Sequence, residues 1–252
     1  MKSVLITGAA QGIGAATART MAQRGWRVLL ADLHLDKARA VAEELQASSP
    51  VEGGHQAIAV DVSSADSVLA AVEAVNAHGD GLDGLVNCAG ILTRQPAEDT
   101  DLPKWQAVLD THLNGAMLMS RELFPLLKAA KGSIVNIASV GSTLGLPGRL
   151  AYTVAKSGIL GMTRTLAVEW GHHGLRVNAV APGYVDTEMI RSGFREGTLN
   201  EAELLRRTPL GRLAQADDIA SAIAFLLGHD ARFVHGVTLK VDGGITIDGS
   251  FN

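Results

Sequence analysis

The sequence predicts a three-layer α/β/α sandwich, in which helices cover both faces of one parallel sheet of about seven strands. Two observations support this fold class. Short apolar runs recur along the chain, and each is almost continuously hydrophobic, as strands buried on both faces of a parallel sheet are. Strand and helix patterns alternate to about residue 182 without a linker or repeat, so residues 1–252 are expected to form a single domain.

The predicted elements follow this alternation in order. Helix-forming residues with apolar positions at helical spacing predict helices over 15–24 and 35–47, and Gly25 stands where a helix C-terminus favours glycine. Ser63 or Ser64 is expected to cap a third helix. The expected strands are the runs SVLIT, WRVLLAD, HQAIAVD, DGLVNC, GSIVNIAS, LRVNAVAP and VTLKVD. Such an alternation is typical of a Rossmann-type doubly wound sheet.

One segment interrupts the alternation between the sixth expected strand and the last helix. Residues 186–213, DTEMIRSGFREGTLNEAELLRRTPLGRL, are polar and contain several glycines. Loops of this kind often carry function, so we expect a mobile lid over the substrate site. An ordinary surface excursion is the alternative.

Composition and charge exclude several classes of partner. The formal net charge is −4 and no run of Lys or Arg forms a basic stripe, so no binding to nucleic acid or to an anionic membrane is expected. No stretch reaches the ~18 apolar residues of a membrane span, and glycines interrupt the N-terminal apolar run, unlike a secretory signal. Cys88 is the single cysteine, which fits a reducing, cytoplasmic location.

A glycine-rich turn, TGAAQGIG, follows the first expected strand and contains Gly8, Gly12 and Gly14. Glycine lets the backbone approach a ligand closely, and the free N–H groups at the start of the next helix attract phosphate. The turn therefore predicts a pyrophosphate site. No Gly-Lys-Ser/Thr follows, which argues against a triphosphate loop, and Thr17 stands where the usual dinucleotide fingerprint has its third glycine. A tight turn without a ligand is the alternative.

Asp32 ends the second expected strand, 18 residues after Gly14. An acidic side chain there accepts hydrogen bonds from the adenosine ribose hydroxyls and repels a 2′-phosphate, so NAD is expected in preference to NADP. Capping of the next helix is the alternative role. The nearby His34, Lys37 and Arg39 leave room for some use of NADP.

Several motifs together resemble the classical branch of the short-chain dehydrogenase/reductase family over nearly the whole chain. They are TGAAQGIG at 7–14, NCAG at 87–90, Asn114, Ser139, YTVAK at 152–156, APGYVDT at 181–187 and VDGG at 241–244. One departure is Cys88, which occupies the second position of the family's Asn-Asn-Ala-Gly. We expect this change to affect packing and not chemistry.

The resemblance implies a site for hydride and proton transfer. Tyr152 is implied as the general base in alcohol oxidation and the general acid in ketone reduction. Lys156 is implied to hold the nicotinamide ribose, and Ser139, which fits the family's Ser-to-Tyr spacing better than Ser142, to bond the substrate oxygen. Asn114, in an otherwise apolar helix, is implied to hold a water that relays protons from Lys156; a structural asparagine is the alternative.

The spacing of Tyr152 and Lys156 has an electrostatic consequence. An unperturbed tyrosine has a pKa near 10, and lowering it by two or three units requires ~3 to 4 kcal/mol. Residues i and i+4 of a helix lie ~5 to 6 Å apart at Cβ, and at an effective dielectric constant of ~20 a charge at that distance supplies ~3 kcal/mol. Lys156 is therefore expected to stabilise most of a Tyr152 phenolate.

The resemblance also implies the cofactor contacts. Asp61 and Val62 are implied to meet the adenine, and Val185 and Thr187 the carboxamide. The full cofactor-binding set is Gly8, Gln11, Gly12, Ile13, Gly14, Asp32, Asp61, Val62, Asn87, Ala89, Gly90, Tyr152, Lys156, Pro182, Gly183, Val185 and Thr187, and the substrate-binding residues are Ser139 and Tyr152.

No metal site is expected, because the eight histidines include no helix-spaced or cysteine-spaced set of ligands. The setting of Cys88 at a strand end favours a small buried hydrophobe over a nucleophile.

We therefore expect an NAD-dependent oxidoreductase that interconverts a secondary alcohol and a ketone. A polyol or sugar-like alcohol is preferred to a 3-oxoacyl thioester of an acyl carrier protein, because the expected pocket has no charged clamp apart from Arg149 and the more distant Arg94. A non-catalytic dinucleotide sensor or scaffold is the alternative from another class, and too little chain follows residue 182 for a nucleotide-sugar epimerase. The resemblance implies a homotetramer, with which small and apolar residues over 152–170 are compatible.

Overall fold

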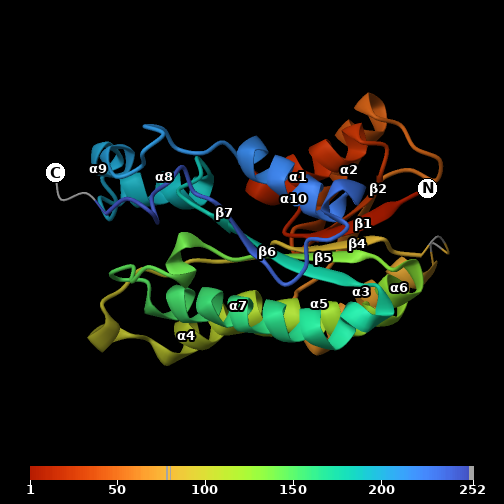
Figure 1. Ribbon diagram of the computed structural model, residues 1–252, viewed down its shortest axis with the longest axis horizontal. Helices are drawn as coiled ribbons and strands as arrows, with labels where there is room; N and C mark the ends of the chain where they lie inside the picture. Colours follow the sequence, from red (N-terminus) through yellow and green to blue (C-terminus); the bar gives the residue numbers. More distant parts are fainter. Residues whose placement is uncertain (78, 80, 250–252) are drawn as a thin grey trace.

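Seven strands form one fully parallel sheet in the order β3-β2-β1-β4-β5-β6-β7, which confirms the predicted fold class (Figure 1). The computed structural model describes residues 1–77, 79 and 81–249. The strands are β1 (Ser3–Thr7), β2 (Arg27–Asp32), β3 (Gln56–Ala59), β4 (Gly84–Asn87), β5 (Ser133–Ile137), β6 (Arg176–Pro182) and β7 (Thr238–Val241). Each lies within one of the predicted apolar runs.

Helices cover both faces of the sheet. In Figure 1, α1, α2 and α10 lie on one face, α4, α5 and α7 lie on the other, and α8 and α9 extend beyond one end of the sheet. The α-helices are α1 (Gly12–Gln23), α2 (Leu35–Ser48), α3 (Ala65–Ala77), α4 (Leu102–Leu109), α5 (Gly115–Glu122), α6 (Phe124–Ala130), α7 (Leu150–Trp170), α8 (Glu188–Arg195), α9 (Glu201–Arg206) and α10 (Ala216–Leu227). Within the described residues, none of these helices is both long and apolar enough to cross a membrane.

The alternation of side chains along β1 explains the continuous apolar runs. Val4 and Ile6 belong to a core cluster that also contains residues of α1, α2 and α10, whereas Leu5 belongs to a second cluster with residues of α3 and α5. All three side chains are fully buried. In a strand covered on both faces, side chains that point to either face are buried, so apolar residues do not alternate with polar ones and the sequence is apolar throughout.

Two helix boundaries show how local sequence sets the ends. Helix α1 begins at Gly12, three residues before the predicted start, because the glycine turn itself forms its first turn. Gly25 follows α1 with φ of +76°, as predicted for a helix C-terminus. Of the two candidate caps of α3, Ser64 accepts a hydrogen bond from the Ser67 N–H (3.3 Å), whereas the Ser63 hydroxyl donates to Asp61 (2.6 Å).

The 186–213 segment is helical and not irregular, since it contains α8 and α9. It is attached at both ends by an isolated parallel bridge between Val185 and Ala214. Arg94 holds its middle, donating to the Met189 carbonyl (2.6 Å) and pairing with Glu196 (3.2 Å). Its action as a mobile lid stays a prediction.

Candidate active site

The strand order reverses between β1 and β4, so the helices after these strands lie on opposite faces and leave a crevice at their carboxyl ends. The glycine turn lies at this point and is tightly packed. Gly8 and Gly12 have left-handed φ angles of +67° and +54°. A Cβ on Gly14 would lie 2.1 Å from the Gly8 carbonyl oxygen, and one on Gly8 would lie 2.8 Å from the Ala89 Cα. The backbone at the start of α1 therefore fits a pyrophosphate.

Thr7 joins the carboxyl ends of β1 and β4. Its hydroxyl accepts hydrogen bonds from the backbone N–H groups of Cys88 (3.0 Å) and Ala89 (3.1 Å). The run from Asn87 to Gly90 thereby lies beside the glycine turn, as the resemblance implies for a wall of the cofactor cleft.

A buried polar chain lies behind this wall. The Asn87 amide donates to the Asn136 side chain (2.8 Å) and to the Ser120 hydroxyl (3.0 Å), and the Asn136 amide donates to Thr163 (3.0 Å). The Oδ1 atom of Asn87 is buried and has no hydrogen-bond partner among the described residues. A buried acceptor without a partner fits a site that a bound group completes.

Asp32 links the glycine turn to α2. Its Oδ2 accepts from the Ala10 N–H (2.9 Å) and its Oδ1 from the His34 N–H (2.9 Å). The carboxylate therefore closes the turn before α2 but does not cap that helix, whose N-cap residue is His34. Each oxygen keeps a lone pair that can accept from a ribose hydroxyl.

The remaining cofactor candidates surround the same crevice. Pro182 is the last residue of β6, Gly183 follows it, and Val185 is buried. Thr187 precedes α8, and its Cγ2 is the nearest neighbour of a Cβ built on Gly12, at 3.6 Å. The start of the 186–213 segment therefore lies against the glycine turn.

Asp61 and Val62 follow β3. The Asp61 carboxylate accepts from the N–H (2.9 Å) and hydroxyl (2.6 Å) of Ser63, and Val62 is buried against Gly115 of α5. Their contact with an adenine stays a prediction.

Ser139 follows β5 and faces Tyr152 of α7. The Ser139 hydroxyl accepts from the Gly141 N–H (3.0 Å), and its hydrogen bond with Tyr152 partly offsets the burial that raises the Tyr152 pKa. The Ser142 hydroxyl is used elsewhere, since it donates to the Lys156 carbonyl (2.8 Å). The geometry thus favours Ser139 over Ser142 as the partner of a substrate oxygen.

The pKa of Tyr152 is raised in the protein alone, because burial disfavours the phenolate more than the Ser139 hydroxyl and the Arg149 charge favour it. The Lys156 ammonium lies 5.7 Å from the Tyr152 ring centroid and donates to the Ile137 carbonyl (2.6 Å). The expected lowering of the Tyr152 pKa by Lys156 is therefore not found, because the ammonium is directed to a carbonyl and not to the phenol oxygen.

Lys156 is itself poised to bind another group. It is buried, and burial lowers its pKa to about 8. Among the described residues its three N–H groups find one acceptor, the Ile137 carbonyl. A desolvated ammonium with donors to spare fits the ribose hydroxyls of a nicotinamide dinucleotide.

That Asn114 holds a water beside Lys156 stays a prediction. The Asn114 side chain is exposed and donates to Asp110 (2.6 Å), within a π-helical turn, Asp110–Asn114, and not an α-helix. A buried histidine two positions earlier, His112, contacts the Tyr152 ring instead, with centroids 5.3 Å apart and planes at 89°.

His112 is the site residue that the sequence analysis missed. Its Nε2 lies 2.6 Å from the Ile91 carbonyl and 3.1 Å from the Ile91 N–H, and its Nδ1 is buried without a partner among the described residues. Burial lowers its pKa to about 3, so the ring is neutral. Gly90 leaves room for it, since a Cβ there would lie 2.3 Å from the imidazole. No signal in the sequence set it apart, since its neighbours Asp110, Thr111 and Asn114 are polar as well.

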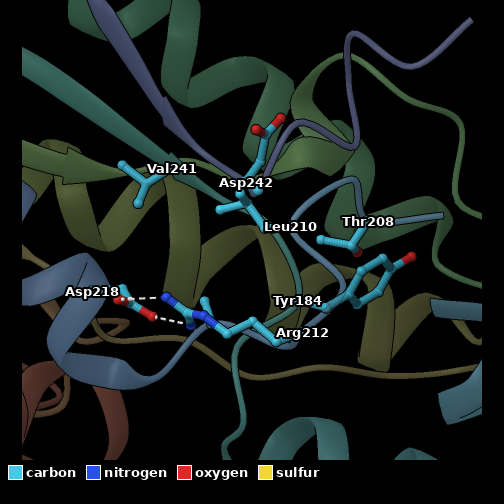
Figure 2. Close-up of a pocket in the computed structure, with 10 residues that line it drawn as sticks. Tyr184, Thr208, Leu210, Arg212, Asp218, Val241 and Asp242 are labelled. Atoms are coloured by element: carbon cyan, nitrogen blue, oxygen red, sulfur yellow. Dashed lines mark hydrogen bonds and ion pairs between the residues drawn. The ribbon is translucent and has the colours of Figure 1, made fainter. Parts of the chain in front are cut away.

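Tyr184 lies between the catalytic cluster and a cavity of about 200 Å³. Its phenol acts electrostatically on both Tyr152 and Arg149. Figure 2 shows the Tyr184 hydroxyl pointing away from the ion pair of Arg212 and Asp218 (2.6 Å) on the other side of the cavity. The cavity is lined by Gly183, Tyr184, Thr208, Leu210, Arg212, Ala214, Asp218, Val241, Asp242 and Gly243.

Cys88 and metal ions are not indicated as reactive groups. Burial raises the pKa of the Cys88 thiol to about 11, which leaves it protonated and a poor nucleophile at neutral pH. In the part of the chain that the structure describes, no cluster of three or more His, Cys, Asp or Glu side chains could hold a metal. That the reaction needs no metal stays a prediction.

A glycine turn at the switch point of a parallel sheet, with a Ser-Tyr-Lys cluster beside it, defines a dinucleotide-dependent oxidoreductase. Residues 8–246 match the family model described as enoyl-(acyl carrier protein) reductase. The chain belongs to the short-chain dehydrogenase/reductase family, as the sequence resemblance predicted. It is an NAD(P)-dependent enzyme that interconverts secondary alcohols and ketones.

Named relatives support this class. D-threitol dehydrogenase of Mycolicibacterium smegmatis is 40% identical over 98% of this chain and 93% of its own length, and trans-4-hydroxycyclohexanecarboxylate dehydrogenase of Sinomonas cyclohexanicum is 39% identical over 97% and 93%. The crystal structure of a putative NAD(P)-dependent gluconate 5-dehydrogenase from Beutenbergia cavernae, with NADP bound, superposes with a TM-score of 0.89 at 36% identity, covering 98% of this chain and 97% of that one.

Proposed function

We propose that the enzyme oxidises a secondary hydroxyl of a small polyol, cyclic alcohol or hydroxy acid, with NAD preferred to NADP and Tyr152 as the acid/base. The observation that carries this proposal is the position of Tyr152, facing Ser139 and beside the buried Lys156 at the crevice of the glycine turn. When bound, the nicotinamide dinucleotide takes up or supplies the hydride.

Each residue of the cluster has a separate task. Tyr152 takes the hydroxyl proton during oxidation and returns it during reduction, and Ser139 bonds the substrate oxygen as charge develops on it. Lys156 holds the ribose, while the Ser139 hydroxyl and the Arg149 charge offset part of the burial that raises the Tyr152 pKa. His112 holds the Tyr152 ring from the opposite side of the turn.

The preference for NAD rests on Asp32, whose buried carboxylate ends β2 and would repel a 2′-phosphate. The Beutenbergia cavernae structure, at 36% identity, holds NADP at low occupancy, so a relative can bind a cofactor that carries the 2′-phosphate. His34, Lys37 and Arg39 are the residues that would allow the same here.

Relatives support the substrate range, since their names include a threitol, a gluconate, a cyclohexanol and a cyclopentanol dehydrogenase and two hydroxycyclohexanecarboxylate dehydrogenases. Initial rates with a panel of such alcohols, with NAD and with NADP, test the proposal. Net NADH formation from at least one of them is expected. Turnover of acetoacetyl thioester with NADH alone would favour the acyl reductase, and cofactor binding without any turnover would favour a sensor.

We also propose a cytoplasmic homotetramer that uses α7 as an interface. Leu150, Val154 and Val168 of α7 are large apolar side chains exposed to solvent in the single chain (43%, 41% and 83%). Covering them against a second copy would remove apolar surface from water. Light scattering of the purified protein tests this, and a monomer at working concentration would refute it.

A further inference from the structure

We propose that Arg149 binds a carboxylate of the substrate, so that the enzyme acts on a hydroxy acid and its keto acid. This inference rests on the proposed function and narrows it. The observations are the place of Arg149 beside Tyr152, its half-burial, and the lack of a carboxylate partner in the described chain.

Arg149 is held firmly at the edge of the catalytic cluster. It is the residue immediately before α7, and its backbone N–H donates to the Leu146 carbonyl (3.1 Å) while its carbonyl accepts from the Thr153 N–H (2.9 Å). Tyr152 follows three positions later. The preceding residue, Gly148, accepts from the Gln95 N–H (2.9 Å), so the Arg149 backbone is tied to the loop that carries Arg94.

The charges around Arg149 include no anion. Its electrostatic neighbours are the phenols of Tyr152 and Tyr184 and a second guanidinium, that of Arg94. A phenol is not a carboxylate partner, and the Arg94 charge repels that of Arg149. Within residues 1–77, 79 and 81–249, no Asp or Glu forms an ion pair with Arg149.

The other arginines near the substrate side are already paired. Arg94 pairs with Glu196, Arg191 with Asp186, Arg195 with Glu188 and Arg212 with Asp218. These contacts engage four guanidinium groups within or beside the 186–213 segment, whereas no carboxylate of the described residues pairs with Arg149. Arg149 is half-buried, and this burial lowers the pKa of its guanidinium.

A desolvated guanidinium gains most from an anion that it can bond with two parallel N–H groups. A carboxylate matches that fork, and a single unpaired arginine matches its single charge better than that of a phosphate dianion. A substrate that presents a hydroxyl to Tyr152 and a carboxylate to Arg149 is held at two points, which orients the reacting carbon. A neutral polyol leaves the Arg149 charge uncompensated.

The test compares each hydroxy acid with its primary amide, which has nearly the same shape without the charge. We use trans-4-hydroxycyclohexanecarboxylate and gluconate, their amides, and cyclohexanol, with wild type, Arg149→Gln, Arg149→Lys and the exposed control Arg24→Gln. We expect wild type to prefer acid over amide by about 30-fold in kcat/KM, a margin that Arg149→Gln removes and Arg149→Lys partly keeps. Arg24→Gln should keep the full margin.

A second measurement needs no turnover and no variant. Cyclohexanecarboxylate should inhibit the wild-type enzyme competitively against the alcohol, and cyclohexanecarboxamide should inhibit at least about 10-fold more weakly. Equal inhibition by the carboxylate and the carboxamide would overturn the inference, and so would equal kcat/KM for a hydroxy acid and its amide in the wild type. An equal loss of kcat/KM for acid and amide in Arg149→Gln would also overturn it. Preference for a polyol phosphate over both hydroxy acids would also overturn it.

The two proposals fail differently. If cyclohexanol or an amide is oxidised but acids have no advantage, the carboxylate site is refuted and the alcohol dehydrogenase stands. If none of the alcohols reduces NAD or NADP while the cofactor still binds, the proposed function itself is refuted.

Discussion

The imidazole of His112 stands edge-on to the ring of Tyr152, with ring centroids 5.3 Å apart and planes at 89°. This contact joins the π-helical turn after α4 to the catalytic helix α7. The imidazole is held in place by its hydrogen bond to the Ile91 backbone. It fits there because Gly90 has no side chain to occupy the same space. The orientation of the Tyr152 ring therefore depends on a residue that takes no proton itself.

Removing the imidazole should loosen the Tyr152 ring. We expect His112→Ala to lower kcat about 10-fold or more, since misplacement of a catalytic group is costly, and His112→Phe to restore part of it by keeping the ring contact. KM for the cofactor should change little. Steady-state kinetics check this, together with Asn114→Ala. A large loss in Asn114→Ala with none in His112→Ala would reinstate Asn114 as the functional residue.

His112 should also make stability pH-dependent. Its pKa is lowered to about 3 in the folded state, against about 6.5 when unfolded, so the unfolded chain binds the extra proton as pH falls below about 6.5. This group alone should cost about 1.4 kcal/mol of unfolding free energy on going from pH 8 to pH 5.5. Urea unfolding at fixed protein concentration measures this. In His112→Phe this part of the dependence of unfolding free energy on pH should vanish. An unchanged pH dependence would contradict the lowered pKa of His112.

Tyr152→Phe should remove the acid/base and leave the binding site. We expect kcat to fall about 1,000-fold, within the range of general acid–base catalysis, while the dissociation constant of NADH changes less than about 2-fold. NADH fluorescence titration separates binding from chemistry. If turnover survives the loss of the hydroxyl, Tyr152 is not the proton carrier.

Asp32 should decide the choice of cofactor. Asp32→Ser removes the charge that repels a 2′-phosphate, and we expect the ratio of kcat/KM for NAD to that for NADP to fall at least about 10-fold. Glu43→Gln, which neutralises an exposed carboxylate of α2, is the matched control and should leave the ratio unchanged. Wild type that already favours NADP would refute the role given to Asp32.

Gly14 should tolerate no side chain. A Cβ there would lie 2.1 Å from the Gly8 carbonyl oxygen, so Gly14→Ala must displace the glycine turn. We expect a loss of about 2 to 3 kcal/mol in unfolding free energy and a large loss of cofactor affinity. Gly145→Ala, where a Cβ meets nothing within 4 Å, is the control. Equal behaviour of the two variants would show that the turn is not tightly packed.

Periodicity determined the fold, because strands covered on both faces must be apolar at every position, as Val4, Leu5 and Ile6 show. The glycine turn could also be predicted from the sequence, because its left-handed φ angles and close backbone contacts exclude residues other than glycine. The strand-end and helix-start placement of Ser139, Tyr152 and Lys156 followed from the same pattern combined with the family resemblance.

Only the tertiary structure decided what each side chain meets. It placed His112 against the Tyr152 ring and left the Asn114 side chain exposed and bonded to Asp110. It directed the Lys156 ammonium to the Ile137 carbonyl and left Arg149 half-buried without a carboxylate among the described residues. Spacing along the chain determines which side chains can meet, but desolvation and the direction of each charge depend on what packs around them, and that is set by segments far apart in the sequence.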